Sequence, residues 1–235
     1  MENPATDRQR VDAVLLDAYG TLLEMPDPVP RLQALLADAG HDHPREIVAA
    51  ALRAEIAFYR QHHDRGRDAR SLADLRLDCA GVLAAGLAGD APPPPRLERI
   101  LVESLQFRLF PDALPALDAL RSRGVSLAVV SNWDCGLPDV LAQLGVAERF
   151  ATISVSALVG ARKPDPAIFH HALARLGVPP SAALHCGDLP HTDCLGAHRA
   201  GVAAVVLDRP GVLAGSGCPR IRSLADLPSR IGGER

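Results

Sequence analysis

Lysine is almost absent from this chain. Of the 25 basic residues among 235, only Lys163 is a lysine, and the other 24 are arginines. The P-loop that binds nucleotide phosphates needs a lysine followed by serine or threonine, and Lys163 is followed by Pro164. The chain also lacks the H-E-x-x-H pattern of zinc proteases and the G-x-S-x-G pattern of serine esterases. These three classes of enzyme are therefore excluded.

Long hydrophobic runs and a charge of one sign are also missing. No apolar run approaches the roughly 18 residues that cross a bilayer, and the first ten residues, MENPATDRQR, lack the apolar core of a signal peptide. A net charge of −3 argues against a nucleic-acid-binding protein, which is normally basic. The five cysteines include no C-x-x-C pair, which favours a reducing compartment. We expect a cytoplasmic protein with neither a membrane nor a nucleic acid as partner.

Five short apolar segments have the composition of buried strands. They are Val11–Leu16, Ser126–Val130, Thr152–Val155, Ala182–Cys186 and Ala203–Leu207. Between the last four lie helical patterns that begin after turn residues and end at glycine. Such alternation of strand and helix predicts an α/β fold of Rossmann-like type, in which helices cover both faces of a parallel sheet.

The segment from 26 to 107 differs, because it contains no strand-like run. Its apolar residues recur at helical spacing, as in Ile47, Ala51, Ala54 and Phe58. The run Ala91–Pro95 (APPPP) predicts a stiff extended connector. We therefore expect a small all-helical cap domain at 26–107, inserted into a discontinuous α/β core made of 8–25 and 108–235.

Polar residues follow four of the predicted strands. In an open parallel sheet, ligands bind at the carboxyl ends of the strands, so these residues should meet at one edge. An aspartate after a strand is often only a turn or helix-cap residue, but four strands with the same feature make coincidence a poor explanation. The set comprises Asp17, Ser131, Asn132, Lys163, Asp188 and Asp193.

The order of these motifs resembles that of the haloacid dehalogenase (HAD) superfamily of hydrolases. The segments DAYGTL, VVSN, ARKPDP and GDLPHTD occur in the order of the family and span most of the chain. The resemblance implies that Asp17 is the nucleophile, since a carboxylate can form a covalent intermediate that water then hydrolyses. It also implies that Thr21 and Ser131, together with Asn132 and backbone amides of the DAYGTL loop, bind the transferred group.

The same resemblance implies a role for the single lysine and a metal site. Lys163 would supply a compact positive charge among the carboxylates, which a planar guanidinium does not replace. Mg²⁺ prefers oxygen ligands, and the family pattern assigns it to Asp17, the backbone carbonyl of Tyr19 and Asp188. Asp193 would bind the metal through water or orient Lys163.

Tyr19 departs from the phosphatases of this family, which carry an acid/base aspartate at that position. An unperturbed tyrosine has a pKa of about 10, so it can donate a proton at neutral pH but is a poor base. The 2-haloacid dehalogenases of the family have a DxYGTL segment like this one, and a halide leaves without protonation. They lack the metal-binding GDLPHTD form, however. Phosphonoacetaldehyde hydrolases use a cap lysine, and the predicted cap contains none.

The sequence therefore favours a Mg²⁺-dependent phosphatase of a small phosphorylated metabolite that acts through an aspartyl-phosphate. The alternatives are a 2-haloacid dehalogenase-like hydrolase acting on a halogenated substrate and a non-catalytic family member. Neither the physiological substrate nor the oligomeric state follows from the sequence.

A few further residues are interpreted without a catalytic role. Cys186 should be an inert thiol in a buried strand, whereas Cys135 and Cys194 near strand ends could be partly reactive, although no base is evident. His185 and His191 flank the metal motif and are expected to support it. The Arg- and His-rich stretch between Arg53 and Arg70 is interpreted as a solvated helix face and loop rather than an anion-binding surface.

Overall fold

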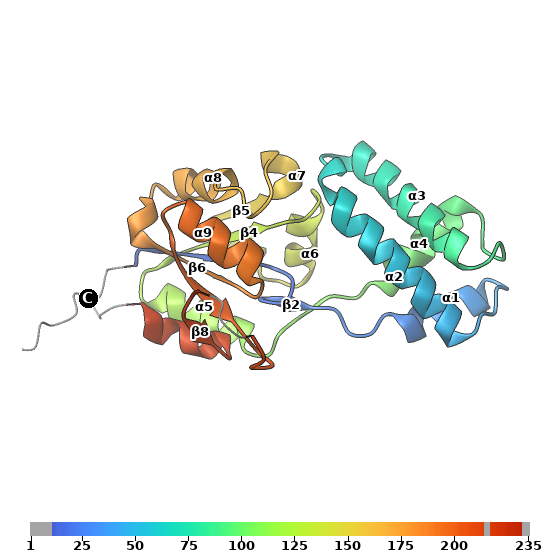
Figure 1. The fold of residues 1–235 in the computed structure, drawn as a ribbon, viewed down its shortest axis with the longest axis horizontal. Helices are drawn as coiled ribbons and strands as arrows, with labels where there is room; N and C mark the ends of the chain where they lie inside the picture. The colour runs from blue at the N-terminus through green and yellow to red at the C-terminus, as the bar shows by residue number, and fades with distance from the viewer. Residues whose placement is uncertain (1–10, 214–216, 232–235) are drawn as a thin grey trace, which may run out of the picture. The chain divides into compact units, whose positions relative to one another are not determined.

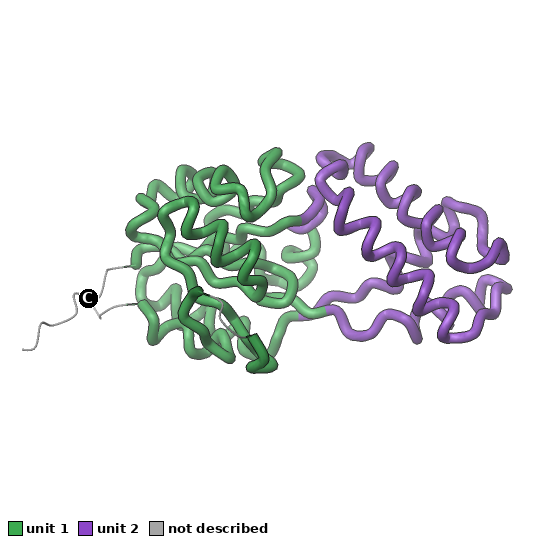
Figure 2. The backbone as a smooth tube through the Cα atoms, viewed as in Figure 1, with its two compact units in different colours: residues 1–24, 109–132, 138–235 green, residues 25–108, 133–137 purple. Residues whose placement is uncertain are grey.

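The computed structural model describes residues 11–213 and 217–231. The chain forms two compact units, each with its own packing (Figure 2). Unit 1 comprises Met1–Glu24, Leu109–Asn132 and Pro138–Arg235, and unit 2 comprises Met25–Arg108 and Trp133–Leu137. That residues 26–107 act as a cap domain stays a prediction, and unit 2 also takes in the short segment that follows Asn132.

Unit 1 is built on a six-stranded parallel sheet with the strand order β5-β4-β1-β6-β7-β8 (Figure 1). The strands are β1 (Ala13–Leu16), β4 (Ser126–Ser131), β5 (Thr152–Val155), β6 (Ala183–Gly187), β7 (Ala203–Leu207) and β8 (Arg220–Ile221). Leu16, the last residue of β1, pairs with Val129 of β4 and Cys186 of β6. The carboxyl ends of these three strands therefore lie side by side.

All five predicted strands are present within one or two residues of their expected limits. The sequence did not reveal β8, nor the two-stranded sheet of β2 (Leu23–Glu24) and β3 (Arg108–Leu109). Each of these three strands has only two residues, which is too short to produce a recognisable apolar run.

Helices cover both faces of the sheet, as predicted. One core cluster packs the strand residues Leu15 and Val130 against Phe169 of α8 and Ala197 of α9, all nearly or fully buried. The helix α5 lies on the opposite side of the sheet (Figure 1). The helices outside unit 2 are α5 (Ala113–Ser122), α6 (Leu137–Gln143), α7 (Ser156–Val159), α8 (Ala167–Leu176) and α9 (Leu195–Arg199), with short turns η2 (Ala147–Arg149), η3 (Pro180–Ala182) and η5 (Leu224–Arg230).

One predicted helix of unit 1 is irregular. The sequence suggests a continuous helix at 192–200, whereas the chain forms a π-type turn, η4 (Pro190–Cys194), followed by α9. In this turn the Asp193 backbone amide donates to the Leu189 carbonyl at 2.8 Å, and the Leu189 amide donates to the Asp193 side chain at 2.9 Å. The turn therefore aims the Asp193 carboxylate back towards the end of β6.

Unit 2 is entirely helical apart from its connecting segments. Its elements are α1 (Val29–Asp38), α2 (Arg45–His62), η1 (His63–Arg65), α3 (Ala69–Gly86) and α4 (Pro94–Ser104). The helices enclose a leucine-rich core in which Leu32, Leu75, Leu83 and Leu97 are almost fully buried. Burying such a side chain contributes about 1.5–3 kcal/mol.

Two expectations for unit 2 need correction. The inward face of α2 consists of Val48, Ala51, Leu52 and Glu55, whereas the predicted stripe member Ile47 is exposed. The buried carboxyl of Glu55 interrupts the apolar pattern and hid the true face. The run Ala91–Pro95 is also not extended throughout, because α4 begins at Pro94; proline lacks an amide hydrogen but needs none in the first turn of a helix.

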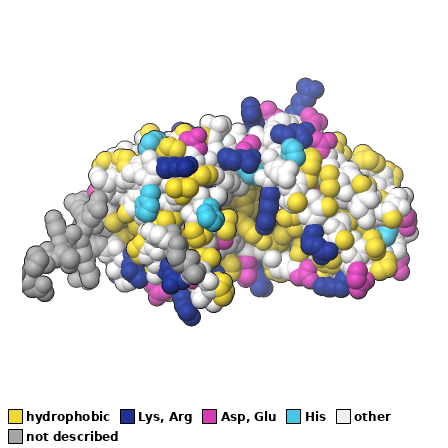
Figure 3. All heavy atoms as spheres, viewed as in Figure 1, with side chains coloured by type: hydrophobic (Ala, Val, Ile, Leu, Met, Phe, Trp, Pro, Cys, Tyr) yellow, Lys and Arg dark blue, Asp and Glu magenta, His cyan; other side chains and the backbone are white. Residues whose placement is uncertain are grey.

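Among the described residues, none of the helices has the length and hydrophobicity that crossing a bilayer requires. Figure 3 shows acidic and basic side chains interspersed on the face that it presents, without a continuous basic stripe.

Candidate active site

The site lies at the carboxyl edge of the unit 1 sheet, where polar residues follow neighbouring strands. Asp17 directly follows β1, Ser131 ends β4, and Asp188 directly follows β6. Because these three strands are adjacent and in register, their following residues are brought together although they are far apart in sequence. The site expected at this edge of the sheet is thus assembled within unit 1.

Lys163 lies at the centre of this group. Its Nζ donates to Oδ1 of Asp17 and to Oδ1 of Asp193, both at 2.6 Å, and the residue is 3% exposed. Burial alone would lower the pKa of Lys163, but the two carboxylates outweigh burial and raise that pKa. The side chain is therefore a fixed ammonium ion between two carboxylates.

The backbone of Lys163 is held by Asn132. The Asn132 side chain donates to the Lys163 carbonyl at 3.0 Å, and its oxygen accepts from the Lys163 amide at 2.7 Å. The peptide bond between Lys163 and Pro164 is cis. Both polar atoms of the Asn132 side chain contact this backbone, so Asn132 positions Lys163, and its substrate contact stays a prediction.

Asp17 is buried and contacts two other members of the site. Besides the ammonium of Lys163, its Oδ1 accepts from the Ser131 hydroxyl at 3.2 Å. Burial raises the pKa of Asp17, and Lys163 offsets part of this effect. Both of these hydrogen bonds are made to Oδ1, so one carboxylate oxygen of Asp17 is anchored while the other can point at a ligand.

Asp193 has both of its carboxylate oxygens in use. Oδ1 accepts from Lys163 and lies 2.9 Å from Nε2 of His185, and Oδ2 accepts from the Leu189 amide. Burial would raise the pKa of Asp193, but Lys163 and His185 together hold it below its ordinary range. Of the two roles that the sequence left open, these contacts favour the orientation of Lys163.

Asp188 is the least satisfied carboxylate of the group. Its Oδ1 is buried and has no hydrogen-bond partner among the described residues. Burial first, and then the carboxylates of Asp17 and Asp193, raise the pKa of Asp188 to about 7. Gly20, at φ +87°, packs so closely that an added Cβ would lie 2.2 Å from Oδ2 of Asp188. A residue with a side chain at position 20 would therefore collide with the Asp188 carboxylate.

These carboxylates suit a divalent cation. One oxygen from each of Asp17, Asp188 and Asp193 lies within 4.8 Å of the others. Three carboxylates surround a single ammonium, and one oxygen of Asp188 has no hydrogen-bond partner among the described residues. Oxygen donors of this kind are those that Mg²⁺ prefers, so the residues present fit that ion.

The loop after β1 is closed by its own backbone. The amides of Leu22 and Leu23 both donate to the Ala18 carbonyl at 2.8 Å, and the Gly20 amide donates to the Leu23 carbonyl at 2.8 Å. These three amides are therefore used within the loop, and the binding of the transferred group by other amides of the DAYGTL segment stays a prediction. The hydroxyl of Thr21 is buried with no partner among the described residues, and Tyr19 is 38% exposed.

An arginine that the sequence did not single out supports this loop. Arg209, two residues beyond β7, donates to the Thr21 carbonyl at 2.9 Å and to both oxygens of Asp112 at 2.8 and 3.0 Å. Its guanidinium lies 3.8 Å from the ring centroid of Phe110. Burial would raise the pKa of Asp112, but hydrogen bonds from Arg209 and Ser223 lower it. In a chain with 24 arginines, no local pattern distinguishes this one.

Two of the cysteines differ from what the sequence predicts. Cys194 and Cys218 form a disulfide, with a Cα–Cα distance of 6.3 Å, although the sequence suggested only thiols. Their separation of 24 residues matches no C-x-x-C pattern, so proximity arises only from the fold. This pair removes the cysteine-based support for a reducing compartment, because stable disulfides are uncommon there. Cys186 is a buried thiol, as expected.

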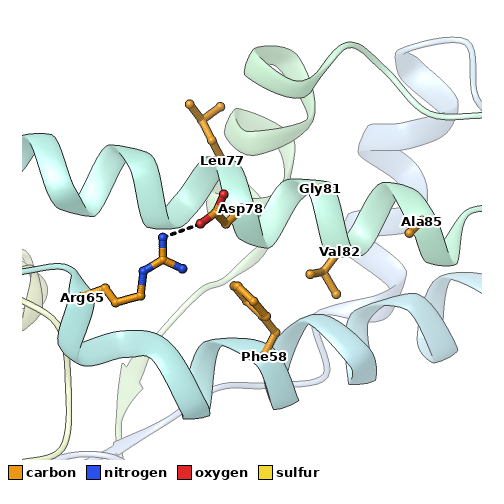
Figure 4. A pocket seen from close by; sticks show the side chains of 7 residues that line it. All are labelled: Phe58, Arg65, Leu77, Asp78, Gly81, Val82 and Ala85. Atoms are coloured by element: carbon orange, nitrogen blue, oxygen red, sulfur yellow. Dashed lines mark hydrogen bonds and ion pairs between the residues drawn. The ribbon is translucent and has the colours of Figure 1, made fainter.

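Unit 2 holds Trp133, the single tryptophan of the sequence, and the Arg- and His-rich stretch between Arg53 and Arg70. Trp133 packs edge-on against Phe107, with ring centroids 5.3 Å apart, which favours a packing role. His63 is 5% exposed and is therefore not part of a solvated face, because it packs beside Tyr59. A shallow pocket between α2 and α3 is crossed by an ion pair between Arg65 and Asp78 at 2.6 Å (Figure 4). None of the candidate catalytic carboxylates lines it.

Comparison with known proteins agrees with this geometry. The family model of haloacid dehalogenase-like hydrolases matches residues 11–201. A phosphoserine phosphatase of Thermus thermophilus is 32% identical over 225 residues, covering 83% of this chain and 88% of the relative. Solved structures also match over nearly the whole chain, and two of them are described next.

The first solved structure is a HAD phosphatase from Thermococcus onnurineus, with 27% identity, a TM-score of 0.67, and coverage of 96% of this chain and 100% of the other. The second is a 2-haloacid dehalogenase from Pseudomonas syringae, with 25% identity, a TM-score of 0.64, and coverage of 94% and 97%. The family model spans most of the chain, and the four motifs that resemble the family meet at one edge of a parallel sheet. The chain therefore belongs to the haloacid dehalogenase-like hydrolases.

Proposed function

We propose that this hydrolase is a Mg²⁺-dependent phosphatase of a small phosphorylated metabolite. The observation that carries the proposal is Asp188, a half-buried residue whose buried oxygen Oδ1 has no hydrogen-bond partner among the described residues and which lies beside the nucleophile candidate Asp17. A dehalogenase acting without metal has no use for such a group, whereas a cation would satisfy it. The phosphatase names of a relative and of a structural neighbour support the same choice.

The anchored Asp17 is placed to act as the nucleophile. Its free carboxylate oxygen attacks phosphorus, the bond from phosphorus to the alcohol oxygen breaks, and an aspartyl-phosphate forms. Water then attacks the phosphorus of this intermediate, which releases inorganic phosphate and restores the carboxylate. Lys163 holds the other oxygen of Asp17 and offsets negative charge throughout. In this proposal the hydroxyls of Thr21 and Ser131 donate to the phosphoryl oxygens, and Ser131 gives up its hydrogen bond to Asp17 to do so.

The metal would be held by Asp17, Asp188 and the backbone carbonyl of Tyr19, with Asp193 acting through Lys163 or a water molecule. Bound there, Mg²⁺ supplies positive charge that offsets the charge of the phosphoryl group. Without it, Asp17 and Asp188 repel each other, which is one cause of the raised pKa of Asp188.

Tyr19 directs the proposal towards substrates with a good leaving group. A phenol can give a proton to the departing oxygen at neutral pH, but it accepts one poorly from the attacking water. An acyl phosphate needs less help with departure than an alkyl phosphate does. We therefore propose acyl phosphates or similarly activated esters as the favoured class.

The test is a panel of p-nitrophenyl phosphate, acetyl phosphate and 2-chloropropionate, each with Mg²⁺ or with EDTA. We expect phosphate release that EDTA abolishes and that Asp17→Asn, the control for contaminating enzymes, lacks. Acetyl phosphate should be the better substrate. Phosphate release that is equal with EDTA, or retained by Asp17→Asn, would contradict the proposal.

One observation favours a second function, dehalogenation of a 2-haloacid. Tyr19 stands where the family's dehalogenases carry tyrosine, and the fold matches that of a 2-haloacid dehalogenase. Chloride release from 2-chloropropionate that is indifferent to EDTA would establish this function. If neither phosphate nor chloride is released, Tyr19→Asp distinguishes a degenerate site, because restoring an acid/base carboxylate should then produce measurable phosphatase activity.

A further inference from the structure

A second group of ligating side chains lies apart from the carboxylates. Among the described residues, Cys194, His198 and Cys218 form a cluster in which one ligand atom from each lies within 4.8 Å of the others. Nδ1 of His198 is 3.9 Å from Sγ of Cys194, and Nε2 of His198 is 3.6 Å from Sγ of Cys218. The imidazole therefore has a nitrogen beside each sulfur.

The fold positions all three residues through ordered elements. Cys194 ends the turn η4 and His198 lies four residues later in α9, so both side chains share one face of a helical turn. Cys218 comes two residues before β8, where Arg220 pairs with Val206 of β7. Cys194 and His198 are thus close in sequence, and the pairing of β8 with β7 brings Cys218 to them.

The donor types are those of a zinc site. Two cysteine sulfurs and one histidine nitrogen occur together in zinc proteins, with a water molecule in the fourth position. Bonds of about 2.3 Å to sulfur and about 2.0 Å to nitrogen, at a tetrahedral angle, put the two ligand atoms roughly 3.6 Å apart. The distance from Nε2 of His198 to Sγ of Cys218 has this value, so Nε2 is the nitrogen that would bind the ion, and the two bonded sulfurs would separate when the disulfide is reduced. His198 is exposed, so an ion can reach the cluster from solvent.

We propose that Cys194, His198 and Cys218 bind one Zn²⁺ when the disulfide is reduced. A dithiol reductant supplies two electrons and two protons to the disulfide, which becomes two thiols while the reductant becomes a disulfide. Zinc then displaces the two thiol protons and binds both thiolates and the imidazole. The disulfide and the zinc site exclude each other, because a sulfur bonded to sulfur is not a thiolate ligand.

The experiment uses Co²⁺ as a spectroscopic substitute for zinc, on the full chain. The protein is reduced with a phosphine, which competes for metal less than a dithiol does, and excess Mg²⁺ occupies the carboxylate site. We expect one equivalent of Co²⁺ to produce a thiolate-to-cobalt charge-transfer band that Zn²⁺ abolishes. The oxidised protein should give no such band.

Variants assign the band to its ligands. Cys218→Ser should remove most of the charge-transfer intensity, and His198→Ala should weaken Co²⁺ binding at least tenfold. Cys135→Ser is the matched control, because Cys135 is a partly exposed thiol outside the cluster, and it should leave the band unchanged. Should Cys218→Ser fold poorly, His198→Ala at an exposed position still tests the proposal.

Three results would overturn the proposal. They are a reduced wild-type protein with no charge-transfer band, a band that survives in both Cys218→Ser and His198→Ala, and a band that Cys135→Ser removes. If Co²⁺ binds but produces no thiolate-to-cobalt charge-transfer band, its ligands are oxygen atoms, and this outcome counts as the first of these results. None of the outcomes depends on hydrolase activity, so the zinc site and the proposed phosphatase can fail independently.

Discussion

At the scale of single residues, Lys163 explains why one lysine persists in an arginine-rich chain. Its Nζ sits between two carboxylates at 2.6 Å in a buried space. A guanidinium is planar and wider, and it cannot place one nitrogen at the same distance from both oxygens without moving the surrounding residues. The size of the cation therefore matters as well as its charge.

We predict that Lys163→Arg lowers kcat for the phosphatase reaction about a hundredfold although the charge is kept, because preorganised charges lose their effect when displaced. Steady-state kinetics on the preferred phosphate substrate measures this. Lys163→Met serves as the control for loss of charge, and circular dichroism checks that both variants fold. An arginine variant within threefold of wild type would mean that only the charge matters.

Sequence reasoning located the site residues better than it described their contacts. Asp17, Ser131 and Asp188 could be located because a residue that ends or follows a parallel strand lies at a known edge of the sheet. The use of Asn132 to hold Lys163 could not be predicted, because it depends on the path of a loop. The pairing of Cys194 with Cys218 likewise depends on tertiary structure alone.

At the scale of secondary-structure elements, the support of the loop after β1 comes from the end of β7. Arg209 links the Thr21 carbonyl to Asp112, and Asp112 also accepts from the Ser223 hydroxyl at 2.6 Å and the Leu224 amide at 2.9 Å. The loop after β1, the residue before α5 and the segment after β7 thus meet at the ion pair between Arg209 and Asp112. The loop that carries Tyr19 and Thr21 is held from outside the site.

We predict that Arg209→Lys lowers kcat about tenfold with little change in KM, because a small displacement of Thr21 affects the transition state more than substrate binding. Asp112→Asn should have a similar, smaller effect, since it weakens the ion pair from the other side. Kinetics with p-nitrophenyl phosphate separates kcat from KM. Arg199→Lys, an exposed arginine of α9, is the matched control. A change in KM alone would argue against this positioning role.

The helix α2 carries a buried carboxyl whose protonation should affect stability. Burial raises the pKa of Glu55, and a hydrogen bond with Cys79 offsets part of that effect. The folded protein therefore keeps this proton to a higher pH than the unfolded chain does. The free energy of unfolding falls as pH rises from the ordinary pKa of 4.5 through the folded pKa, and it stays lower above that.

We predict that Glu55→Gln is more stable than wild type at pH 8, and that the difference shrinks as pH falls towards 4. Urea unfolding at several pH values measures this, and Glu46→Gln controls for the loss of a carboxyl from the exposed side of the same helix. A difference that is independent of pH, or that grows as pH falls, would contradict the assignment.

Elements were predictable where many residues repeat one pattern. The five longer strands are apolar throughout, and the helices of unit 2 show helical spacing. The two-residue strands are below the length at which a pattern exists. The predicted inward face of α2 was wrong because the true face includes Glu55, and glutamate is seldom buried.

At the scale of the whole molecule, described residues of the two units pack into separate hydrophobic clusters. The cluster around Phe169 in unit 1 and the cluster around Leu83 in unit 2 share no residue. A single packed domain unfolds in one cooperative transition, whereas a chain with several domains can unfold in more than one. Each unit is therefore expected to have its own stability.

We predict that Leu83→Ala, at a fully buried position, destabilises unit 2 by about 2–5 kcal/mol and leaves the proposed Mg²⁺ site intact. Calorimetry should show one transition lowered by the substitution and another raised by Mg²⁺, since a ligand stabilises the unit that binds it. Leu173→Ala in α8, buried in the other core, should lower the Mg²⁺-sensitive transition instead. A single transition that responds to both would mean that the two units unfold together.

The order of strands in the sheet also has a consequence for synthesis of the protein. β1 is translated before the residues of unit 2, yet its neighbours on either side begin only at Ser126 and Ala183. On the ribosome, both edges of β1 stay unpaired while the residues of unit 2 emerge, and unpaired strand edges promote aggregation. The nucleophile candidate at the end of β1 is thus made before unit 2, and the carboxylates and lysine that surround it are made after unit 2.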